Sequence, residues 1–395
     1  MDRQAEFDII VYGASGFTGR LVAEYLAKAY GVGKDLKWAM AGRSLDKLAA
    51  VRDEIGAPKE TPLVEADADD PASLKAMAAR TKAVITTVGP YQLYGEALVA
   101  ACAEAGTDYL DLCGEPAWMR KMIDAYDAKA KASGARIVFS CGFDSIPFEL
   151  GVFFLEETAK KTLGTTVPRA KGRVRKMQGG FSGGTAASLK ATMAAAAKDP
   201  GVVALLMNPF ALTPGFEGPA QPPGMAPELD PDLGMWTAPF VMAPINTRNV
   251  HRSNALLGHA YGTDFVYDEM MITGPGEQGE AMAKAVAQMG SQALGGENAP
   301  KPGEGPSKEE REAGFYDVLF VGTAKDGRQV RVAVSGDKDP GYGSTSKMIA
   351  EAAICLVKDT AEVPGGIWTP GAAMGNRLIK RLTENAGLKF EVEAA

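Results

Sequence analysis

Short apolar runs alternate with stretches of helically spaced apolar residues over the first 145 residues of the chain. The run Asp8–Tyr12 (DIIVY) is typical of a strand buried on both faces of a parallel sheet. Similar runs predict further strands at 36–41, 61–66, 83–88, 108–112 and 136–140. Helical spacing predicts helices between them, at 20–30, 44–55, 70 onward, 95–105 and 118–133. Repeated strand–helix units of this size predict an α/β fold, with a Rossmann-type doubly wound parallel sheet over residues 1–145.

The pattern changes in the part of the chain after residue 146. Longer alternating runs predict strands at 173–178, 265–272, 316–324 and 329–335, and a helix is predicted at 182–197. The last two strands flank Asp326-Gly327, which is a strong hairpin signal. We therefore expect a second α+β domain over residues 146–340, built on a largely antiparallel sheet.

Residues 341–395 have helical periodicity at 344–358 and 371–387. We expect this C-terminal segment to be helical and to pack back on the first domain.

Two irregular stretches interrupt the second half of the chain. In the Pro/Met-rich insert at 207–245, nine prolines lie between Pro209 and Pro244, mixed with methionine and aromatic residues. Long loops are usually functional or disordered, and disordered segments are poor in such apolar residues. An apolar lid, a membrane or partner contact and plain irregular packing therefore stay open. The polar stretch 295–314 is expected to be a solvated loop.

Composition and charge narrow the class of function. A chain of 395 residues is long enough for two domains, and its net charge of −7 without a basic stripe argues against a nucleic-acid partner. No apolar run reaches the roughly 20 residues of a membrane span. The four cysteines and two histidines show no metal-ligand spacing. We expect a cytoplasmic protein with no metal.

The segment Gly13-Ala14-Ser15-Gly16-Phe17-Thr18-Gly19 follows a predicted strand and opens a predicted helix. In that context Gly13 permits a tight turn, Gly16 lets the backbone approach a pyrophosphate, and Gly19 lets the helix pack on the strand. The helix N-terminus then offers its N–H groups to the phosphates. Further phosphate contacts are expected from Ser15, Phe17 and Thr18.

The end of the second predicted strand favours NADP(H) over NAD(H). NAD-binding proteins usually carry a carboxylate there, whereas this chain has Arg43 and Ser44, and a 2′-phosphate needs a cation. Asp67, after the third strand, is placed either to contact the adenine amino group or to cap the next helix.

Several motifs occur in an order that resembles the saccharopine dehydrogenase-like oxidoreductases. They are the segments 13–19, 41–44, 88–91, 109–115, 141–147, 183–185, 339–343 and 368–370. The resemblance covers most of the chain and points to the branch of the mycobacterial trans-acting enoyl reductases and animal saccharopine dehydrogenase-like proteins. It implies an NADP-binding domain followed by an α+β domain, reduction of a carbon–carbon double bond in a lipid- or polyketide-like substrate, and a homodimer.

Candidate catalytic residues follow the fourth, fifth and sixth strands, where a nicotinamide ring would lie. Enoyl reduction needs a hydride at one carbon, a proton at the other and a polarised carbonyl oxygen. Tyr91, after Gly89 and Pro90, could polarise that oxygen or donate the proton, and Pro90 and both neighbours could also contact the cofactor. Glu115 or Asp144 could relay the proton if burial raises its pKa.

Structural roles stay open for each of these residues. Tyr91 could be a stacking wall and Asp144 a helix cap. His251, in a polar segment that follows the insert, is a further acid–base candidate or an ordinary buried histidine.

Three functions stay open at this point. The apolar insert favours an enoyl reductase acting on an apolar small molecule, with peripheral membrane contact through the insert left open. A saccharopine-type amino-acid dehydrogenase would need cations for the substrate carboxylates, and Arg173, Arg175, Arg248 and Arg252 could supply them. A non-catalytic NADP-binding scaffold is the third.

Overall fold

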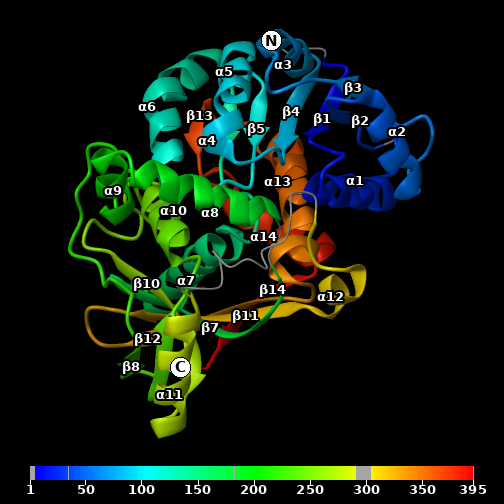
Figure 1. Ribbon diagram of the computed structural model, residues 1–395. Coiled ribbons are helices and arrows are strands. Elements are labelled where there is room, and N and C mark those ends of the chain that lie inside the picture. The colour runs from blue at the N-terminus through cyan, green and yellow to red at the C-terminus, as the bar shows by residue number, and fades with distance from the viewer. Residues whose placement is uncertain (1–4, 34, 181–182, 291–303, 395) are drawn as a thin grey trace.

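Two seven-stranded sheets organise the computed structural model, which describes residues 5–33, 35–180, 183–290 and 304–394 (Figure 1). The first sheet is entirely parallel, in the order β13-β6-β5-β4-β1-β2-β3. Its strands are β1 (Phe7–Tyr12), β2 (Trp38–Gly42), β3 (Leu63–Glu65), β4 (Thr81–Thr86), β5 (Asp108–Leu110), β6 (Arg136–Val138) and β13 (Gly366–Trp368). The helices between them are α1 (Phe17–Tyr30), α2 (Leu45–Glu54), α3 (Pro71–Ala79), α4 (Tyr91–Tyr94), α5 (Glu96–Ala105) and α6 (Pro116–Ser133).

Burial on both faces explains the continuous apolar run of β1. Ile9 and Val11 belong to one hydrophobic core, and Ile10 and Tyr12 belong to another on the opposite face of the sheet. The predicted Rossmann-type doubly wound sheet is confirmed.

The second sheet is mixed, in the order β14-β12-β11-β7-β10-β9-β8, and only its β7–β10 pair is parallel. Its strands are β7 (Arg169–Gln178), β8 (Glu228–Asp230), β9 (Met235–Pro239), β10 (Val266–Gly274), β11 (Phe315–Thr323), β12 (Gln329–Gly336) and β14 (Leu388–Glu393). The predicted hairpin joins β11 to β12, and Gly327 has a φ of +85° there. The largely antiparallel second sheet is confirmed.

The remaining helices lie against this sheet or between the two sheets. They are α7 (Ile146–Leu163), α8 (Gly183–Ala196), α9 (Pro200–Met207), α10 (Ala243–Leu256), α11 (Gly276–Gly290), α12 (Lys308–Ala313), α13 (Thr345–Asp359), α14 (Pro370–Asn385) and the π-helical turn η1 (Pro340–Ser344). Figure 1 shows α8 and the orange α13 between the first sheet above and the second sheet below. No helix in the described ranges is both long and apolar enough to cross a membrane.

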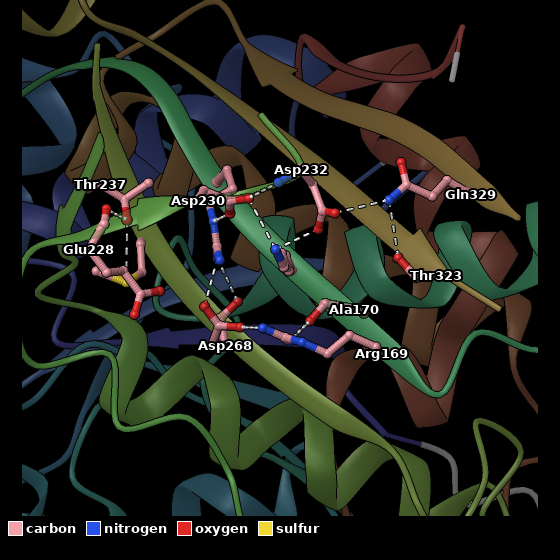
Figure 2. Close-up of polar contacts among 12 residues, drawn as sticks. Arg169, Ala170, Glu228, Asp230, Asp232, Thr237, Asp268, Thr323 and Gln329 are labelled. Carbon is pink, nitrogen blue, oxygen red and sulfur yellow. Dashed lines mark hydrogen bonds and ion pairs between the residues drawn. The ribbon is translucent and has the colours of Figure 1, made fainter. Parts of the chain in front are cut away.

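The insert at 207–245 is more regular than the sequence predicts, because it contains β8, β9 and the start of α10. Ion pairs hold it to the sheet: Asp230 binds Lys171 at 3.0 Å and Arg173 at 2.8 Å, and Arg173 also binds Asp268 at 2.7 Å. Figure 2 shows Asp230 and Asp268 within this network. The predicted irregular stretch is correct for residues 208–227, which contain no helix or strand. It fails at β8, where Asp230 is paired with Lys171 and Arg173 from a part of the chain far away in the sequence.

Two further expectations need correction. Of the expected loop at 295–314, residues 295–303 lie outside the described ranges, while 308–313 form α12. Ser307 and Glu310 make a reciprocal capping box at its start. The C-terminal segment 341–395 is not only helical, since it adds β13 to the first sheet and β14 to the second. β13 is only three residues long, too short to show a periodicity. β14 does alternate apolar and charged residues (LKFEVE), but it lies after the end of the predicted helix at 371–387, in a part of the chain for which no strand was predicted.

A buried carboxylate fastens the C-terminal segment to the first domain. Glu351 of α13 accepts hydrogen bonds from the hydroxyls of Tyr25 (2.6 Å) and Tyr30, and pairs with Arg381 of α14 at 3.1 Å. One side chain thus joins α1, α13 and α14.

Replacing Glu351 by alanine removes an acceptor of the Tyr25 and Tyr30 hydroxyls and one of the two carboxylate partners of Arg381, which keeps its ion pair with Asp359. Each unsatisfied partner costs about 1–3 kcal/mol, so we expect Glu351→Ala to lower the free energy of unfolding by about 3 kcal/mol in urea titrations. Glu384→Ala removes an exposed carboxylate from α14 and should change stability by less than about 0.5 kcal/mol. Equal effects of the two substitutions would contradict this account.

Candidate functional site

A cavity of about 450 Å³ opens at the carboxyl ends of β1, β4, β5 and β6. Its first wall comes from the loops after these strands, its second from α8 and residues 241–245, and its third from η1. The strand order reverses between β1 and β4, and open α/β sheets bind dinucleotides at such a switch point.

The glycine turn before α1 has the geometry of a phosphate cradle. Gly13 has a φ of +86°, and a Cβ atom on Gly19 would lie 2.2 Å from the Gly13 carbonyl oxygen. Only glycine at these positions lets the helix start so close to the strand. Gly16 is the N-cap of α1 and makes no side-chain cap, which leaves the first N–H groups of the helix to a ligand. The residues present therefore fit a dinucleotide pyrophosphate.

Phe17 and Thr18 face the third wall of the cavity. The Phe17 ring packs edge-on against Tyr342 of η1, with 5.1 Å between the ring centroids. Thr18 lines the cavity itself.

Ser15, Arg43, Ser44 and Asp67 lie at the carboxyl ends of β1, β2 and β3. The Ser15 hydroxyl lies 3.7 Å from where a Cβ atom of Gly42 would be. Arg43 is exposed and makes no ion pair with the described residues. Burial, with a smaller contribution from the Asp67 charge, raises the pKa of Tyr12 to about 12, and the Arg43 charge acts in the opposite direction, so both charges lie near that ring. The Ser44 side chain caps α2 by accepting from the Lys47 N–H.

Tyr91 and Glu115 are held by hydrogen bonds to backbone groups of the loops after β4 and β5. The two carboxylate oxygens of Glu115 accept the backbone N–H groups of Tyr91 (3.0 Å) and Gln92 (2.8 Å), after Gly89-Pro90. The Tyr91 hydroxyl donates to the Thr86 carbonyl at 3.3 Å and accepts from the Leu112 N–H at 3.1 Å. Both residues line the cavity, but these bonds hold their polar atoms on the loops after β4 and β5.

Asp144 is a carboxyl group in the cavity wall whose oxygens are not engaged by other described residues. It lies in the cavity wall beside Gly114, where a Cβ atom would be 3.7 Å from its Oδ2, and it forms no hydrogen bond or ion pair with the described residues. Burial raises the pKa of Asp144 to about 7. The raised pKa favours the protonated form of this carboxyl, as a proton donor requires.

His251 lies away from this cavity. Its ring packs on Phe210 and Phe265, with centroids 4.7 and 6.0 Å apart. Burial lowers the pKa of His251 to about 3, so the imidazole is neutral at physiological pH. The structure does not bring His251 together with Asp144.

The four arginines considered for carboxylate binding are engaged elsewhere. Arg173 binds Asp230 and Asp268, and Arg175 binds Asp317 and Glu393. Arg248 donates to the carbonyls of Pro244 and Leu206, and Arg252 to those of Leu212 and Ile367. None of them lines the cavity.

The sequence motifs predict no role for Thr185, Tyr342 and Thr345, which are among the hydroxyl residues that line the cavity. Thr185 and Tyr342 lie in motifs that carry the family resemblance, and that was the only signal available for them. Only the structure shows that α8 and η1, which are far apart in the sequence, both border the cavity.

Comparisons with known proteins agree with this geometry. Residues 9–138 match the family described as saccharopine dehydrogenase NADP binding domain. The chain is 44% identical, over 95% of both chains, to a protein of Mycobacterium tuberculosis (strain ATCC 25618 / H37Rv) provisionally named a trans-acting enoyl reductase. It is 40% identical, over 96% of both chains, to the trans-acting enoyl reductase of Mycobacterium bovis (strain BCG / Pasteur 1173P2).

Solved structures share the fold at much lower identity. The apo saccharopine dehydrogenase (L-Glu forming) of Saccharomyces cerevisiae has a TM-score of 0.56 at 13% identity, with 98% of this chain and 100% of that chain covered. The homospermidine synthase of Legionella pneumophila, in complex with NAD, has a TM-score of 0.53 at 11% identity, covering 99% and 92%. The resemblance inferred from the motifs is confirmed. The chain belongs to the saccharopine dehydrogenase-like family of NADP-binding proteins, together with the trans-acting enoyl reductases.

Proposed function

We propose that the protein is an NADPH-dependent enoyl reductase that reduces the carbon–carbon double bond of an apolar α,β-unsaturated acyl thioester. The observation that carries this proposal is the Asp144 carboxyl, with a pKa of about 7, in the wall of the cavity that the glycine turn also borders. The names of the relatives support the same reaction class.

The lining of the cavity favours an apolar substrate. Apolar side chains such as Leu112, Met177, Leu189 and Met242 form much of its wall, and no lysine or arginine lines it within the described ranges. A saccharopine-type substrate carries several carboxylates, and burying them without cations would be costly. The amino-acid dehydrogenase is therefore the weaker alternative.

The chemistry divides between the cofactor and the chain. NADPH, when bound, supplies a hydride to the β-carbon of the substrate. The electrons of the double bond then move toward the carbonyl oxygen, and Asp144 gives its proton to the α-carbon, which leaves an Asp144 carboxylate that regains a proton from solvent. The first turn of α1 and Arg43 would hold the phosphates of the cofactor, and Glu115 holds the loop after β4 in place.

A substrate panel tests the reaction class. Purified protein should oxidise NADPH with medium- and long-chain enoyl thioesters and not with pairs of an amino acid and a keto acid. Turnover only with the amino-acid pairs would support the saccharopine-type reaction. Tight NADPH binding without turnover of either class would support the scaffold.

The role of Asp144 predicts a specific pH dependence. The acid must be protonated, so kcat/KM should be constant well below pH 7 and fall tenfold per pH unit above about pH 7. Asp144→Asn should lower kcat by about 10²–10⁴-fold and remove this alkaline limb, with NADPH affinity unchanged.

Glu149→Gln is the matched control for this prediction. Burial also raises the pKa of Glu149 to about 7, but its carboxylate binds Ser253 and Gly371 and does not line the cavity. An alkaline limb that disappears with Glu149→Gln and persists with Asp144→Asn would refute the assignment.

The position of Arg43 after β2 predicts that the protein binds NADPH more tightly than NADH. Arg43→Ala removes the cation expected at the 2′-phosphate, so NADPH should bind at least tenfold more weakly while NADH binding changes little. Isothermal titration with both cofactors measures the ratio. Lys129→Ala on α6 makes the same charge change at a distance from the cavity and should leave both affinities intact. An unchanged ratio in Arg43→Ala would exclude this residue as the selector.

A further inference from the structure

A second groove, of about 220 Å³, borders η1 outside the cavity. Its walls come from α1, α12, the residues Lys338 and Gly343, and the first turn of α13. Within the described ranges it shares no lining residue with the cavity that contains Asp144. The groove is therefore a separate site, and the reaction scheme above gives it no role.

Positive charge is concentrated in this groove, although the whole chain carries a net charge of −7. The cations that line it are Lys28, Lys308, Arg311, Lys338 and Lys347, and the carboxylates are Glu24 and Glu312. Glu24 pairs with Lys28, and Glu312 lies 3.9 Å from Lys308. The other three cations come from α12, from the residue before the cap of η1, and from α13.

These three cations have no carboxylate partner of their own. Arg311, Lys338 and Lys347 form no ion pair with the described residues, and all three are partly buried. Arg311 donates to the Pro306 carbonyl at 2.6 Å, which leaves its charge unneutralised. Like charges that converge without a counter-charge repel one another, and a bound anion would remove that repulsion.

We propose that this groove binds a phosphate-bearing small molecule through Arg311, Lys338 and Lys347. A phosphate monoester carries about 1.5–2 negative charges at neutral pH and three acceptor oxygens, which match cationic donors arriving from three elements. A carboxylate carries one charge and would leave cations unpaired. The inference does not depend on the proposed enoyl reduction.

Arg311 connects the groove to the glycine turn of the cofactor site. Its guanidinium lies over the Phe17 ring, 5.6 Å from the centroid, and Phe17 is the first residue of α1, next to Gly16. A Cβ atom on Gly305 would lie 2.5 Å from the same ring, so the segment before α12 packs directly on Phe17. A ligand that holds Arg311 therefore also holds the cover of this turn.

Arg311 is also bound to η1, which forms a wall of the cavity. The Arg311 carbonyl accepts the Asp339 N–H at 3.0 Å. The Asp339 carboxylate in turn accepts the N–H groups of Tyr342 at 3.0 Å and Gly343 at 2.6 Å. An anion that draws Arg311 toward the two lysines thus steadies α12, Phe17 and η1 together.

This connection predicts positive coupling between the groove and the cofactor site. Occupancy of the groove should raise NADPH affinity about fivefold or more, and NADPH should raise the affinity of the groove by the same factor. The reciprocity follows from thermodynamic linkage and gives two independent measurements of one quantity.

The test titrates glycerol 3-phosphate into the full-length protein by calorimetry, with NADP⁺ at saturation so that the phosphate cradle of the glycine turn is already occupied. The wild-type protein should show saturable binding, and Lys338→Ala/Lys347→Ala should weaken it at least tenfold. NADPH affinity, measured with and without glycerol 3-phosphate, should respond to the probe in the wild-type protein and not in the double variant.

Lys284→Ala/Lys325→Ala is the matched control. It makes the same charge change on α11 and on the β11–β12 hairpin, outside the groove, and should leave binding of the probe intact. Equal weakening by the two double variants would show a general effect of charge and refute the site. A wild-type protein that does not bind the probe would refute it as well.

Vesicles of phosphatidylcholine with phosphatidate form a second arm, because a lipid headgroup carries the same phosphate chemistry. Vesicle binding that needs Lys338 and Lys347, without binding of glycerol 3-phosphate, would assign the groove to a lipid and overturn the small-molecule inference. Binding of glycerol 3-phosphate that leaves NADPH affinity unchanged would support the site and refute the coupling.

Discussion

The burial of α13 between α1 and the first sheet is the packing interaction on which the cavity depends. The helix contacts α1, β1, β4 and β5, and its residues from Met348 to Leu356 are all buried. Each large apolar side chain buried in this way contributes about 1.5–3 kcal/mol. Because η1 runs directly into α13, this packing also sets where Tyr342 and Thr345 meet the glycine turn and the loop of Asp144. A segment from the end of the chain thereby completes a site that begins at its start.

Buried hydrogen bonds then fix the loop after β6. Ser145 has a φ of +154°, a conformation that costs free energy for a residue with a side chain. Its hydroxyl donates to Asn246 at 3.1 Å and accepts from Asn249 at 2.7 Å, both on α10. Asn246 in turn donates to Glu269 of β10 at 2.9 Å. The strained backbone beside Asp144 is thus held by the second domain, so the proposed acid keeps its place only when both domains are folded together.

The sequence predicted the first domain well and the second domain only in outline, for a physical reason. Strands buried on both faces, such as β1, and glycines with close backbone neighbours, such as Gly13 and Gly19, leave a local signature. β8 and β13 leave none, because each is only three residues long, and β13 pairs with β6, which lies far away in the sequence. The same limit applies to the site. The sequence identifies Asp144 as a candidate because it follows a strand. Only the structure shows that Asp144 is buried, and that Tyr91 and Glu115 are hydrogen-bonded to backbone groups.

Sharing a fold with yeast saccharopine dehydrogenase does not imply sharing its reaction, because chemistry depends on the side chains that face the cavity. In this chain the buried guanidinium groups serve the architecture. Arg252 joins the insert to β13 through the carbonyls of Leu212 and Ile367, and Arg248 binds the last turn of α9. Burial lowers the pKa of both to about 10, so they stay charged at neutral pH and need those carbonyls as partners. Turning either group toward a substrate carboxylate would break a bond between two elements of the fold. The arginines that kept an amino-acid reaction open are therefore bound within the fold, and none of them lines the cavity that contains Asp144.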